Sequence, residues 1–349
     1  MITPVTHLLP LTHLRRDRML PMKGRVLFNV GDDVKATDVV AEADQHGDHL
    51  ILDIRRALNL RNAEEAHKRM RYKVGEKVEK GDILAQTGGI IPRVLRAQAD
   101  GKVIGIHRGQ IILEAAGSKL QIRAGIAGRI AEVLPDRGLV IEGDGALLQG
   151  VWGNGKIASG MLLIADQPAD NELTRVNLNA NMRGTVALAG HVTTKETLIA
   201  AQELPIGGLI LASMTADLMQ TAVKVNYPLI LMEGFGRIPL NQAAFNLLST
   251  NEKRDIILNG VWDADRNEKP ELFIPLPALG NPAQDYAELT QGKTVRVTVP
   301  PYAGQSALVV TVRPGLTLLA NGQRVNAADI QLDTNLIVTV PLANLDVLE

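Results

Sequence analysis

The chain has 349 residues, a formal net charge of −1 and no cysteine. The absence of cysteine excludes disulfides, thiolate catalysis and cysteine-ligated zinc or iron–sulfur clusters. Hydrophobic residues make up 46% of the chain and charged residues 21%, which provides apolar material for the cores of two or three domains. Aromatic residues are only 3%, which argues against base-stacking platforms, and the near-neutral charge gives no global field that would recruit nucleic acid or an anionic membrane.

The first residues do not resemble a targeting segment. In MITPVTHLLPLTHLRRDRMLP the apolar residues are interrupted by Pro4, His7, Pro10 and His13, and a basic cluster follows them. No run in the chain approaches the roughly 18 apolar residues that a membrane-spanning helix requires. We therefore expect a soluble, cytoplasmic protein with no membrane partner.

The first half of the chain contains short β-branched runs separated by Gly and Asp. The runs are GRVLFNV, GKVIGI, IILEA, GRIAEV and GLVIEG. Strands this short, with turn residues between them, predict an all-β sandwich or barrel. One helix is expected within residues 51–72, where Ile51, Ile54 and Leu58 fall on one helical face. Further on, GVWGNGK predicts a tight hairpin with Trp152 over a core edge, because no strand-to-helix transition surrounds it as a phosphate loop requires.

A twelve-residue pattern occurs twice in this region. Residues 30–41 are VGDDVKATDVVA and residues 74–85 are VGEKVEKGDILA. Gly31 and Gly75 would supply the positive backbone dihedral that such turns need. The pattern resembles the half-motif of the biotinyl/lipoyl-like family, whose fold is the barrel-sandwich hybrid, and QADGKVIGI resembles the second half of that motif. The resemblance covers roughly residues 20–115 and implies this fold for the whole region.

Carrier domains of the biotinyl/lipoyl-like family present a lysine at the tip of the hairpin between the halves. The corresponding connection here, residues 86–101, contains Arg93 and Arg96 but no lysine. A guanidinium cannot form the amide that attaches biotin or lipoate. We therefore expect the fold without its prosthetic group, and no cofactor elsewhere in the chain.

Residues 182–260 change to a regular alternation of strand and helix patterns. GTVALAG, GGLILAS, YPLILME and RDIILNG predict strands, while TTKETLIAAQEL, TADLMQTAVKV and PLNQAAFNLLS predict helices. Pro239 would stand near the first turn of the last helix. Such alternation implies a parallel sheet with right-handed crossovers, in a small Rossmann-like α/β domain.

In an open parallel sheet, ligands bind beyond the carboxyl ends of the strands. Three loops at that edge, GHVTT, ASMT and EGFGRIP, offer hydroxyls, glycines and an arginine. The set would suit a phosphate or a carboxylate, because Arg237 could pair with an anion just before a helix begins. The candidate ligand-binding residues are Thr193, Thr194, Ser213, Thr215, Glu233, Gly234, Gly236 and Arg237.

A structural interpretation of these residues stays open. Thr and Ser before helices usually serve as N-caps, and Glu233 could simply pair with Arg237 across the loop. No G-x-S-x-G, H-E-x-x-H or Walker motif is present, so no catalytic residue is assigned and an enzyme is not favoured. His46 and His49 lie among aspartates, but DQHGDH is better explained as a solvated turn, and we predict no metal site.

Residues 263–288 contain four prolines and no sustained period, which predicts a linker. The tail, residues 289–349, is β again, with NGQR as a hairpin turn. Within it, GKTVRVTVPPYAGQSALVVTV resembles the KOW/SH3-like barrel of NusG-type transcription factors and some ribosomal proteins, although Ala307 stands where the family has a glycine. The tail has balanced charge, whereas nucleic-acid modules are usually positive, so RNA contact is disfavoured against protein contact.

Basic residues cluster in two other segments, near residues 15–25 and 61–73. Charge runs are usually solvated faces, but the two clusters would form one docking patch for an anionic partner if they converged in space. The residues of this patch are Arg15, Arg16, Arg18, Lys68, Arg69 and Arg71.

The predicted architecture is multidomain α+β. A β-rich barrel-sandwich-hybrid part with one inserted helix would span residues 1–172, and the parallel α/β domain residues 173–262. The linker and the SH3/KOW-like β-barrel follow. This combination, with the pattern GFGRIPL-x-x-x-AF-x-LL, resembles a group of uncharacterised bacterial proteins.

Three functions are weighed for this architecture. The favoured one is a noncatalytic scaffold or assembly protein that contacts other proteins, self-association included. The alternatives are a transcription- or ribosome-associated factor acting through the tail, and a domain that binds a phosphate or carboxylate ligand.

Overall fold

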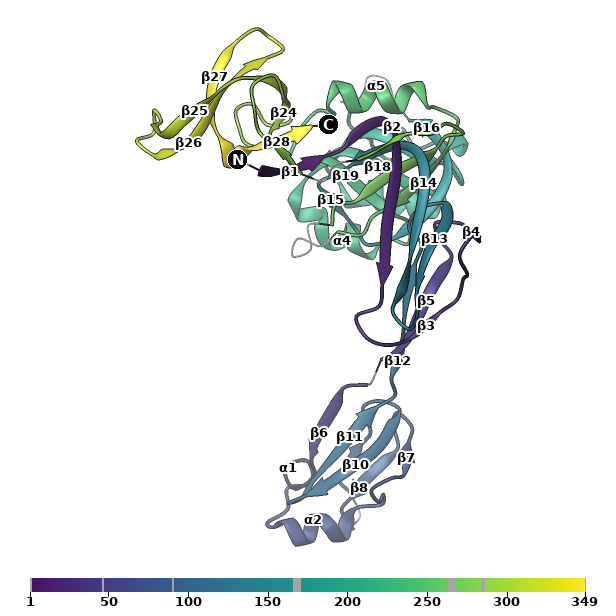
Figure 1. Cartoon of the computed structure of the whole chain (residues 1–349). Helices are drawn as coiled ribbons and strands as arrows, with labels where there is room; N and C mark the ends of the chain where they lie inside the picture. Colours follow the sequence, from purple (N-terminus) through teal and green to yellow (C-terminus); the bar gives the residue numbers. More distant parts are fainter. Residues whose placement is uncertain are drawn as a thin grey trace.

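The computed structural model describes residues 2–45, 47–89, 91–165, 171–262, 268–283 and 286–348. The chain is β-rich and elongated, with three parts, of which the middle one adjoins the other two (Figure 1). We call residues 49–115 the distal lobe, residues 8–45 with 118–283 the central body, and residues 2–6 with 286–348 the C-terminal module. No described helix is long and apolar enough to cross a membrane.

The central body is organised by one mixed sheet, in which twelve strands are described. Four of them, β16 to β19, run parallel in the order β19-β18-β17-β16, and antiparallel strands extend the sheet on both sides. The strands are β2 (Leu8–Met19), β4 (Asp33–Val34), β13 (Gly128–Leu134), β14 (Gly138–Gln149), β15 (Trp152–Gly153), β16 (Ile157–Ile164), β17 (Val186–Val192), β18 (Gly208–Met214), β19 (Leu229–Phe235), β20 (Asp255–Asn259), β21 (Glu271–Pro275) and β22 (Asn281–Pro282).

Helices cover both faces of the parallel strands, because β17 and β18 are apolar on both sides. Every residue of these two strands is buried. Helices α3 (Lys195–Glu203) and α4 (Met219–Lys224) contribute to the core on one face, and α5 (Gln242–Thr250) to the core on the other. The predicted alternation of strands and helices is therefore confirmed through α5 and β20, and the predicted parallel direction is confirmed as far as β19.

Beyond β19 the predicted strand direction and the predicted linker depart from the structure. Strand β20 pairs antiparallel with β16 and β21, so the sheet is mixed. Helix α5 is capped by Asn241, whose side chain accepts from the Ala243 nitrogen, so Pro239 lies before the helix and outside its first turn. The segment predicted as a linker, residues 263–288, supplies β21, in which Leu272, Phe273 and Ile274 are buried. Prolines stand at both ends of β21, and this spacing is typical of a linker although the residues between them form a short apolar strand.

The distal lobe is inserted between two strands of the central body. Strands β5 (Val39–Gln45) and β12 (Ser118–Arg123) pair antiparallel, and with β3 (Arg25–Val26) they form a small sheet at the junction. The lobe has a four-stranded sheet, a hairpin and two short helices (Figure 1). These elements are β6 (His49–Asp53), α1 (Ile54–Leu58), α2 (Ala63–Arg69), β7 (Lys77–Val78), β8 (Ile83–Gln86), β9 (Val94–Arg96), β10 (Gly101–His107) and β11 (Gln110–Ala115).

The single helix expected in residues 51–72 is instead a strand end and two helices. Asn59 adopts a left-handed conformation with φ 54° and ends α1. Ile54 and Leu58 are buried as the helical pattern predicts, whereas Ile51 lies on β6 and is exposed. A left-handed asparagine can stop a helix that apolar spacing alone would continue.

The two copies of the twelve-residue pattern have matching local structures. Gly31 and Gly75 have φ of 91° and 99°. Their nitrogens donate to the carbonyls of Ile130 at 2.8 Å and Val103 at 2.7 Å. The valines three positions on, Val34 and Val78, are both buried. The repeat in the sequence is therefore a repeat in the structure.

The copies nevertheless lie in different parts of the molecule. The first contributes β4 and β5 to the central body, and the second contributes β7 and β8 to the distal lobe. Each copy pairs with its own later strand, β13 in the central body and β10 in the distal lobe. The two copies within residues 20–115 therefore do not share one sheet, because the distal lobe is inserted between β5 and β12.

The C-terminal module is a seven-stranded sheet that includes the start of the chain. Strand β1 (Ile2–Thr6) pairs with β23 (Tyr286–Glu288) and with β28 (Leu345–Leu348). The remaining strands are β24 (Thr294–Val297), β25 (Ser306–Leu318), β26 (Arg324–Leu332) and β27 (Ile337–Pro341). The expected NGQR hairpin joins β25 to β26, with Gly322 at φ 83°. The prediction assigns β1 to a domain of residues 1–172, whereas in the structure β1 lies in the sheet of the C-terminal module.

Candidate functional site

The predicted ligand loops do meet at one edge of the parallel strands. Strands β17, β18 and β19 end at Val192, Met214 and Phe235, and the candidate residues lie at or just beyond these ends. Gly234 and Gly236 have φ of 117° and 121°, which allows the chain to turn sharply after β19. The three loops therefore lie at the same edge of the sheet. The contacts of each side chain determine whether it is free to bind a ligand.

Arg237 lies in a polar cluster with residues that the sequence analysis did not select. Its Nε is 3.0 Å from Nε2 of His191, and its Nη2 is 3.8 Å from Oε2 of Glu172. The same Glu172 carboxylate accepts a hydrogen bond from the Thr193 hydroxyl. The Arg237 side chain is 74% exposed, so its charge faces both solvent and a carboxylate. An anion at this place would have to compete with Glu172.

The hydroxyls of the other two loops are mostly engaged by the protein itself. Ser213 Oγ donates to the Ile238 carbonyl at 2.9 Å and accepts from the Ile238 nitrogen at 3.0 Å, which holds the loop after β19 against β18. Thr194 stands at the N-cap of α3, but its Oγ1 is 2.9 Å from Oγ1 of Thr197. Thr215 Oγ1 is buried and has no hydrogen-bond partner among the described residues.

Glu233 faces the C-terminal module rather than a ligand. Its Oε2 is 3.2 Å from Nη1 of Arg296 on β24, and its Oε1 accepts from the Asn241 nitrogen at 3.0 Å. The pair proposed across the loop, Glu233 with Arg237, is not formed. Burial raises the pKa of Glu233, and the charge of Arg296 opposes that rise.

Arg296 completes a buried ion cluster between the two parts. It is 5% exposed, donates to the Met232 carbonyl at 2.9 Å, and has its Nη2 2.8 Å from Oδ2 of Asp346. Burial alone would lower the pKa of Arg296, but Glu233 and Asp346 together hold it above its usual value. The carboxyl end of β19 is thus bonded to the C-terminal module.

A second buried ion cluster ties β2 to β21. Arg16 donates from Nε to both oxygens of Glu271, at 3.1 and 3.2 Å, and Nε2 of Gln149 donates to Glu271 at 3.1 Å. Burial would raise the pKa of Glu271, but the charge and hydrogen bonds of Arg16, with Arg18 and Gln149, hold it below the usual value. The sequence signal for this cluster is Glu271, a charged residue that directly precedes the apolar residues LFI of β21.

The predicted docking patch is divided between two parts of the molecule. Arg15 is bound by Glu142 at 3.0 Å and by Glu132 at 3.1 Å, and Arg18 Nε donates to the Ala124 carbonyl at 2.6 Å. With Arg16, these side chains belong to the central sheet. The other three residues, Lys68, Arg69 and Arg71, lie on or beside α2 at the far end of the distal lobe (Figure 1). The two basic segments do not converge.

Within the described residues, no group of His, Asp and Glu has the arrangement of a metal site. His46, one of the two histidines considered for a metal, lies outside the described residues. No protein-family model matches the chain, and no curated protein matches it in sequence. The assignment of a function therefore depends on the geometry described above.

Proposed function

We propose that the chain is a noncatalytic scaffold that holds β modules on a central α/β unit and acts through contacts with other proteins. In fold terms, we infer two nested barrel-sandwich hybrids, a Rossmann-like unit and an SH3/KOW-like tail. The matched turns at Gly31 and Gly75 support the first assignment, and the parallel strands β16 to β19 support the second. A cytoplasmic location fits the absence of cysteine.

The observation that carries the proposal is the ion cluster of Glu233, Arg296 and Asp346. Doubly wound α/β proteins hold their ligands at the carboxyl edge of the sheet. Here Glu233, near the carboxyl end of β19, has a buried side chain that is bonded to the tail. A sheet edge used for internal docking favours a structural role over catalysis.

The tail offers an apolar surface for a protein partner. Leu316 and Leu318, near the end of β25, are 66% and 63% exposed. They pair with Asn326 and Arg324 of β26, two residues apart on one face of the hairpin. Neighbouring exposed leucines are typical of interaction sites.

The basic side chains of the tail do not favour RNA. Arg296 is buried in the ion cluster, and Arg313 is bonded through Nε to both oxygens of Asp329 at 3.0 Å. An RNA-binding face needs unneutralised positive charge to replace the counterions of the phosphates. Protein contact is therefore the better assignment for this module.

Sedimentation velocity over a wide concentration range tests self-association as the first form of scaffolding. The wild type is expected to associate, while Leu316→Lys with Leu318→Lys should remain monomeric with an unchanged Tm. Leu279→Lys is the matched control, since Leu279 is 89% exposed but lies in the central body. A wild type that stays monomeric, and that also fails to retain a fixed partner on purification from its own cells, would contradict the proposal.

A thermal-shift screen with phosphorylated and carboxylated metabolites tests the ligand-binding alternative. The cluster of Arg237, His191 and Glu172 gives that alternative an exposed cation at the sheet edge. The scaffold proposal expects equal responses from the wild type and Arg237→Ala. A metabolite that stabilises the wild type and not the variant would overturn it in favour of ligand binding.

A further inference from the structure

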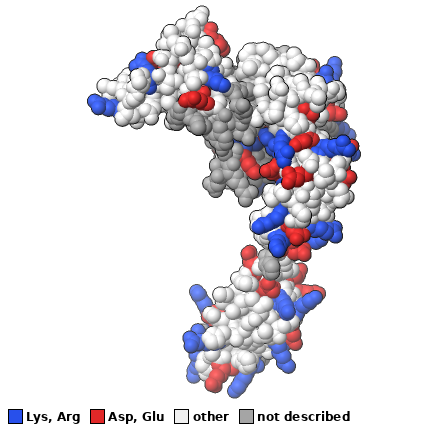
Figure 2. Space-filling model, viewed as in Figure 1, with Lys and Arg blue, Asp and Glu red and all other residues white. Residues whose placement is uncertain are grey.

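The distal lobe differs in charge from the rest of the molecule. Residues 49–115 contain thirteen Lys and Arg against eight Asp and Glu, a formal charge of +5. The whole chain carries −1, which leaves −6 for the remainder. Figure 2 shows Lys and Arg side chains along much of the outline of this lobe. A chain that is nearly neutral as a whole therefore has one strongly basic end.

The basic side chains of the lobe are not neutralised by its own carboxylates. Several acids accept from backbone nitrogens instead: Asp53 from Arg56 at 3.0 Å, Glu76 from Lys73 at 2.8 Å and Asp82 from Glu79 at 2.9 Å. Among the described residues, no Lys or Arg of the lobe forms a salt bridge, whereas the central body pairs Arg15 and Arg16 with glutamates. The positive charge of the lobe is available to a ligand.

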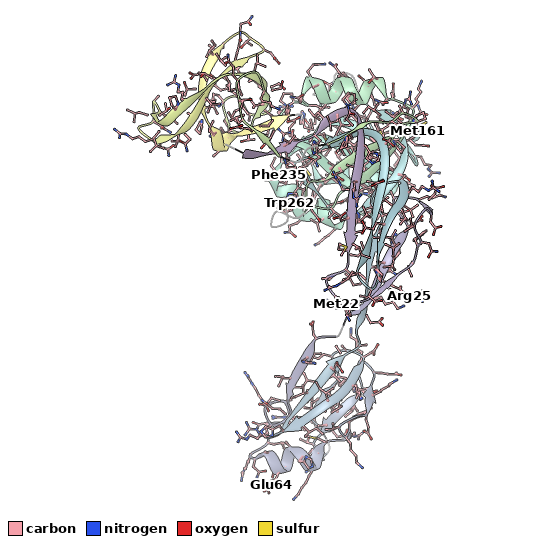
Figure 3. The ribbon with its side chains drawn as sticks, viewed as in Figure 1. Met22, Arg25, Glu64, Met161, Phe235 and Trp262 are labelled. Atoms are coloured by element: carbon pink, nitrogen blue, oxygen red, sulfur yellow. The ribbon has the colours of Figure 1, made fainter. Side chains whose placement is uncertain are left out.

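Some of this charge surrounds a pocket between α2 and the turn that joins β10 to β11. The pocket has a volume of about 420 Å³, within the range of small-molecule sites. Figure 3 shows Glu64, the one acid of the lining, at the far end of the lobe. The lining residues are Ala63, Glu64, His67, Lys68, Ile106, His107, Arg108 and Gly109.

The turn that carries Arg108 has an unfavourable residue at its first position. Arg108 has φ 47° and Gly109 has φ 79°, between the paired residues His107 and Gln110. Hairpin turns of this kind prefer Asn, Asp or Gly at the first position, because a Cβ strains the backbone at positive φ unless it is absent or a short polar side chain hydrogen-bonds locally. A long basic residue at a strained position, facing a pocket, is an outlier that points to a function.

The wall that presents Arg108 is held in place by its neighbours. The Gly109 carbonyl accepts from the Ile54 nitrogen at 3.0 Å. A Cβ at Gly109 would lie 2.7 Å from Cγ of Arg55 and 3.2 Å from Cβ of Ala66, so the turn packs directly against α1 and α2. The pocket is therefore formed before any ligand binds.

We propose that this pocket binds the phosphate group of a small anionic molecule, such as a phosphate monoester or a polyphosphate. The Arg108 guanidinium and the Lys68 ammonium supply the charge-assisted donors that phosphate oxygens prefer, and His67 and His107 add ring nitrogens. The sole aromatic residue of the lobe, Tyr72, donates its hydroxyl to Asp82 at 2.9 Å and does not line the pocket. Recognition is thus of the phosphate rather than of a stacked base.

Isothermal titration of the full chain with inorganic tripolyphosphate tests the site. Arg108→Asn removes the guanidinium and puts a favoured residue into the turn, so its Tm should equal or exceed that of the wild type. We expect about tenfold weaker binding for this variant, the loss of one charge-assisted contact. Lys77→Gln is the matched control, because it removes one charge on the same lobe, outside the pocket, opposite Lys102.

Three titration results would overturn the site. The first is no binding by the wild type, and the second is equal affinity of the wild type and Arg108→Asn. The third is an equal loss of affinity in Arg108→Asn and Lys77→Gln, which would mean diffuse attraction by the charge of the lobe. A competition arm separates the source of the phosphate: if duplex RNA binds the lobe and tripolyphosphate does not displace it, a nucleic-acid backbone on the lobe surface replaces this proposal.

Discussion

The Nη1 atom of Arg296 lies 3.2 Å from Oε2 of Glu233, and this contact joins the C-terminal module to the end of strand β19. Both side chains are buried, at 6% and 1% exposure. Asp346 binds the other end of the same guanidinium at 2.8 Å. Since removal of one member of a buried ion cluster leaves the others without compensation, the contact predicts how strongly the tail depends on Arg296.

Replacing Arg296 by Met should lower the free energy of unfolding by about 3–5 kcal/mol, because Glu233 would then be a buried carboxylate without its cation. Urea denaturation of the full chain measures the loss. The double variant Arg296→Met with Glu233→Leu should be more stable than the single variant, since it removes the stranded charge. The control is Arg313→Ala, whose ion pair with Asp329 is 41% exposed on the arginine side and should contribute less than about 1 kcal/mol. A loss no larger than that of the control would contradict the role given to Arg296.

Glu271 should make the central body sensitive to acid. Its folded pKa lies below its ordinary value of 4.5, so its stabilising contribution is present above about pH 4.5 and is lost as the pH falls through the folded pKa. Glu233, with a raised folded pKa, acts in the opposite direction and gains stability on protonation. A comparison of the wild type with Glu271→Gln separates the contribution of Glu271 from that of Glu233.

Unfolding free energies measured from neutral pH to about pH 3 should show a steeper decline for the wild type than for Glu271→Gln. The variant should be less stable at neutral pH, because Arg16 loses its buried anion. The two curves should then approach each other below about pH 4.5. Parallel curves over this range would show that the carboxylate is not held by Arg16 as described.

Local patterns in the sequence predict the elements that depend on neighbouring residues. The apolar runs of β17, β18 and β19, with helices between them, predict parallel strands, and Asn321 with Gly322 predicts the last hairpin. The twelve-residue repeat predicts the turns at Gly31 and Gly75. In each of these cases the information lies within a short stretch of chain.

Pairings between distant segments could not be predicted in the same way. Arg16 and Glu271 are 255 positions apart, and nothing near either residue specifies the other. Strand β1 joins the sheet of the tail although β2 continues into the central body. At the candidate site, hydroxyls suited to a ligand serve the fold instead, as Ser213 does with Ile238. The insertion of the distal lobe could not be predicted, because both copies of the repeat have the same local sequence pattern and neither indicates which later strand it pairs with.

The two matched glycines should affect different parts of the molecule. Gly31→Ala and Gly75→Ala each place a Cβ at positive φ, which costs about 1–2 kcal/mol. Hydrogen exchange should rise in β4, β5 and β13 for the first variant, and in β7, β8 and β10 for the second. The two variants serve as controls for each other. Exchange that rises over the whole chain in both would show that the distal lobe has no independent stability.

The chain start should be needed for the tail to fold fully. Val5 is 3% exposed, lies in the core of the C-terminal module and pairs with Val347 of β28. Thr6 and the Val5 carbonyl also bind the Lys269 ammonium, at 2.6 and 3.3 Å. Val5→Asp would bury a carboxylate among apolar side chains and should cost about 3–5 kcal/mol, whereas Val5→Ile should cost less than about 1.5 kcal/mol. Hydrogen exchange should rise first in β28 and β24, since β28 would lose one of its two neighbours, while β17 and β18 keep their protection. If Val5→Asp left β28 protected, or exposed the parallel strands equally, then β1 would not be the element that closes the sheet of the tail.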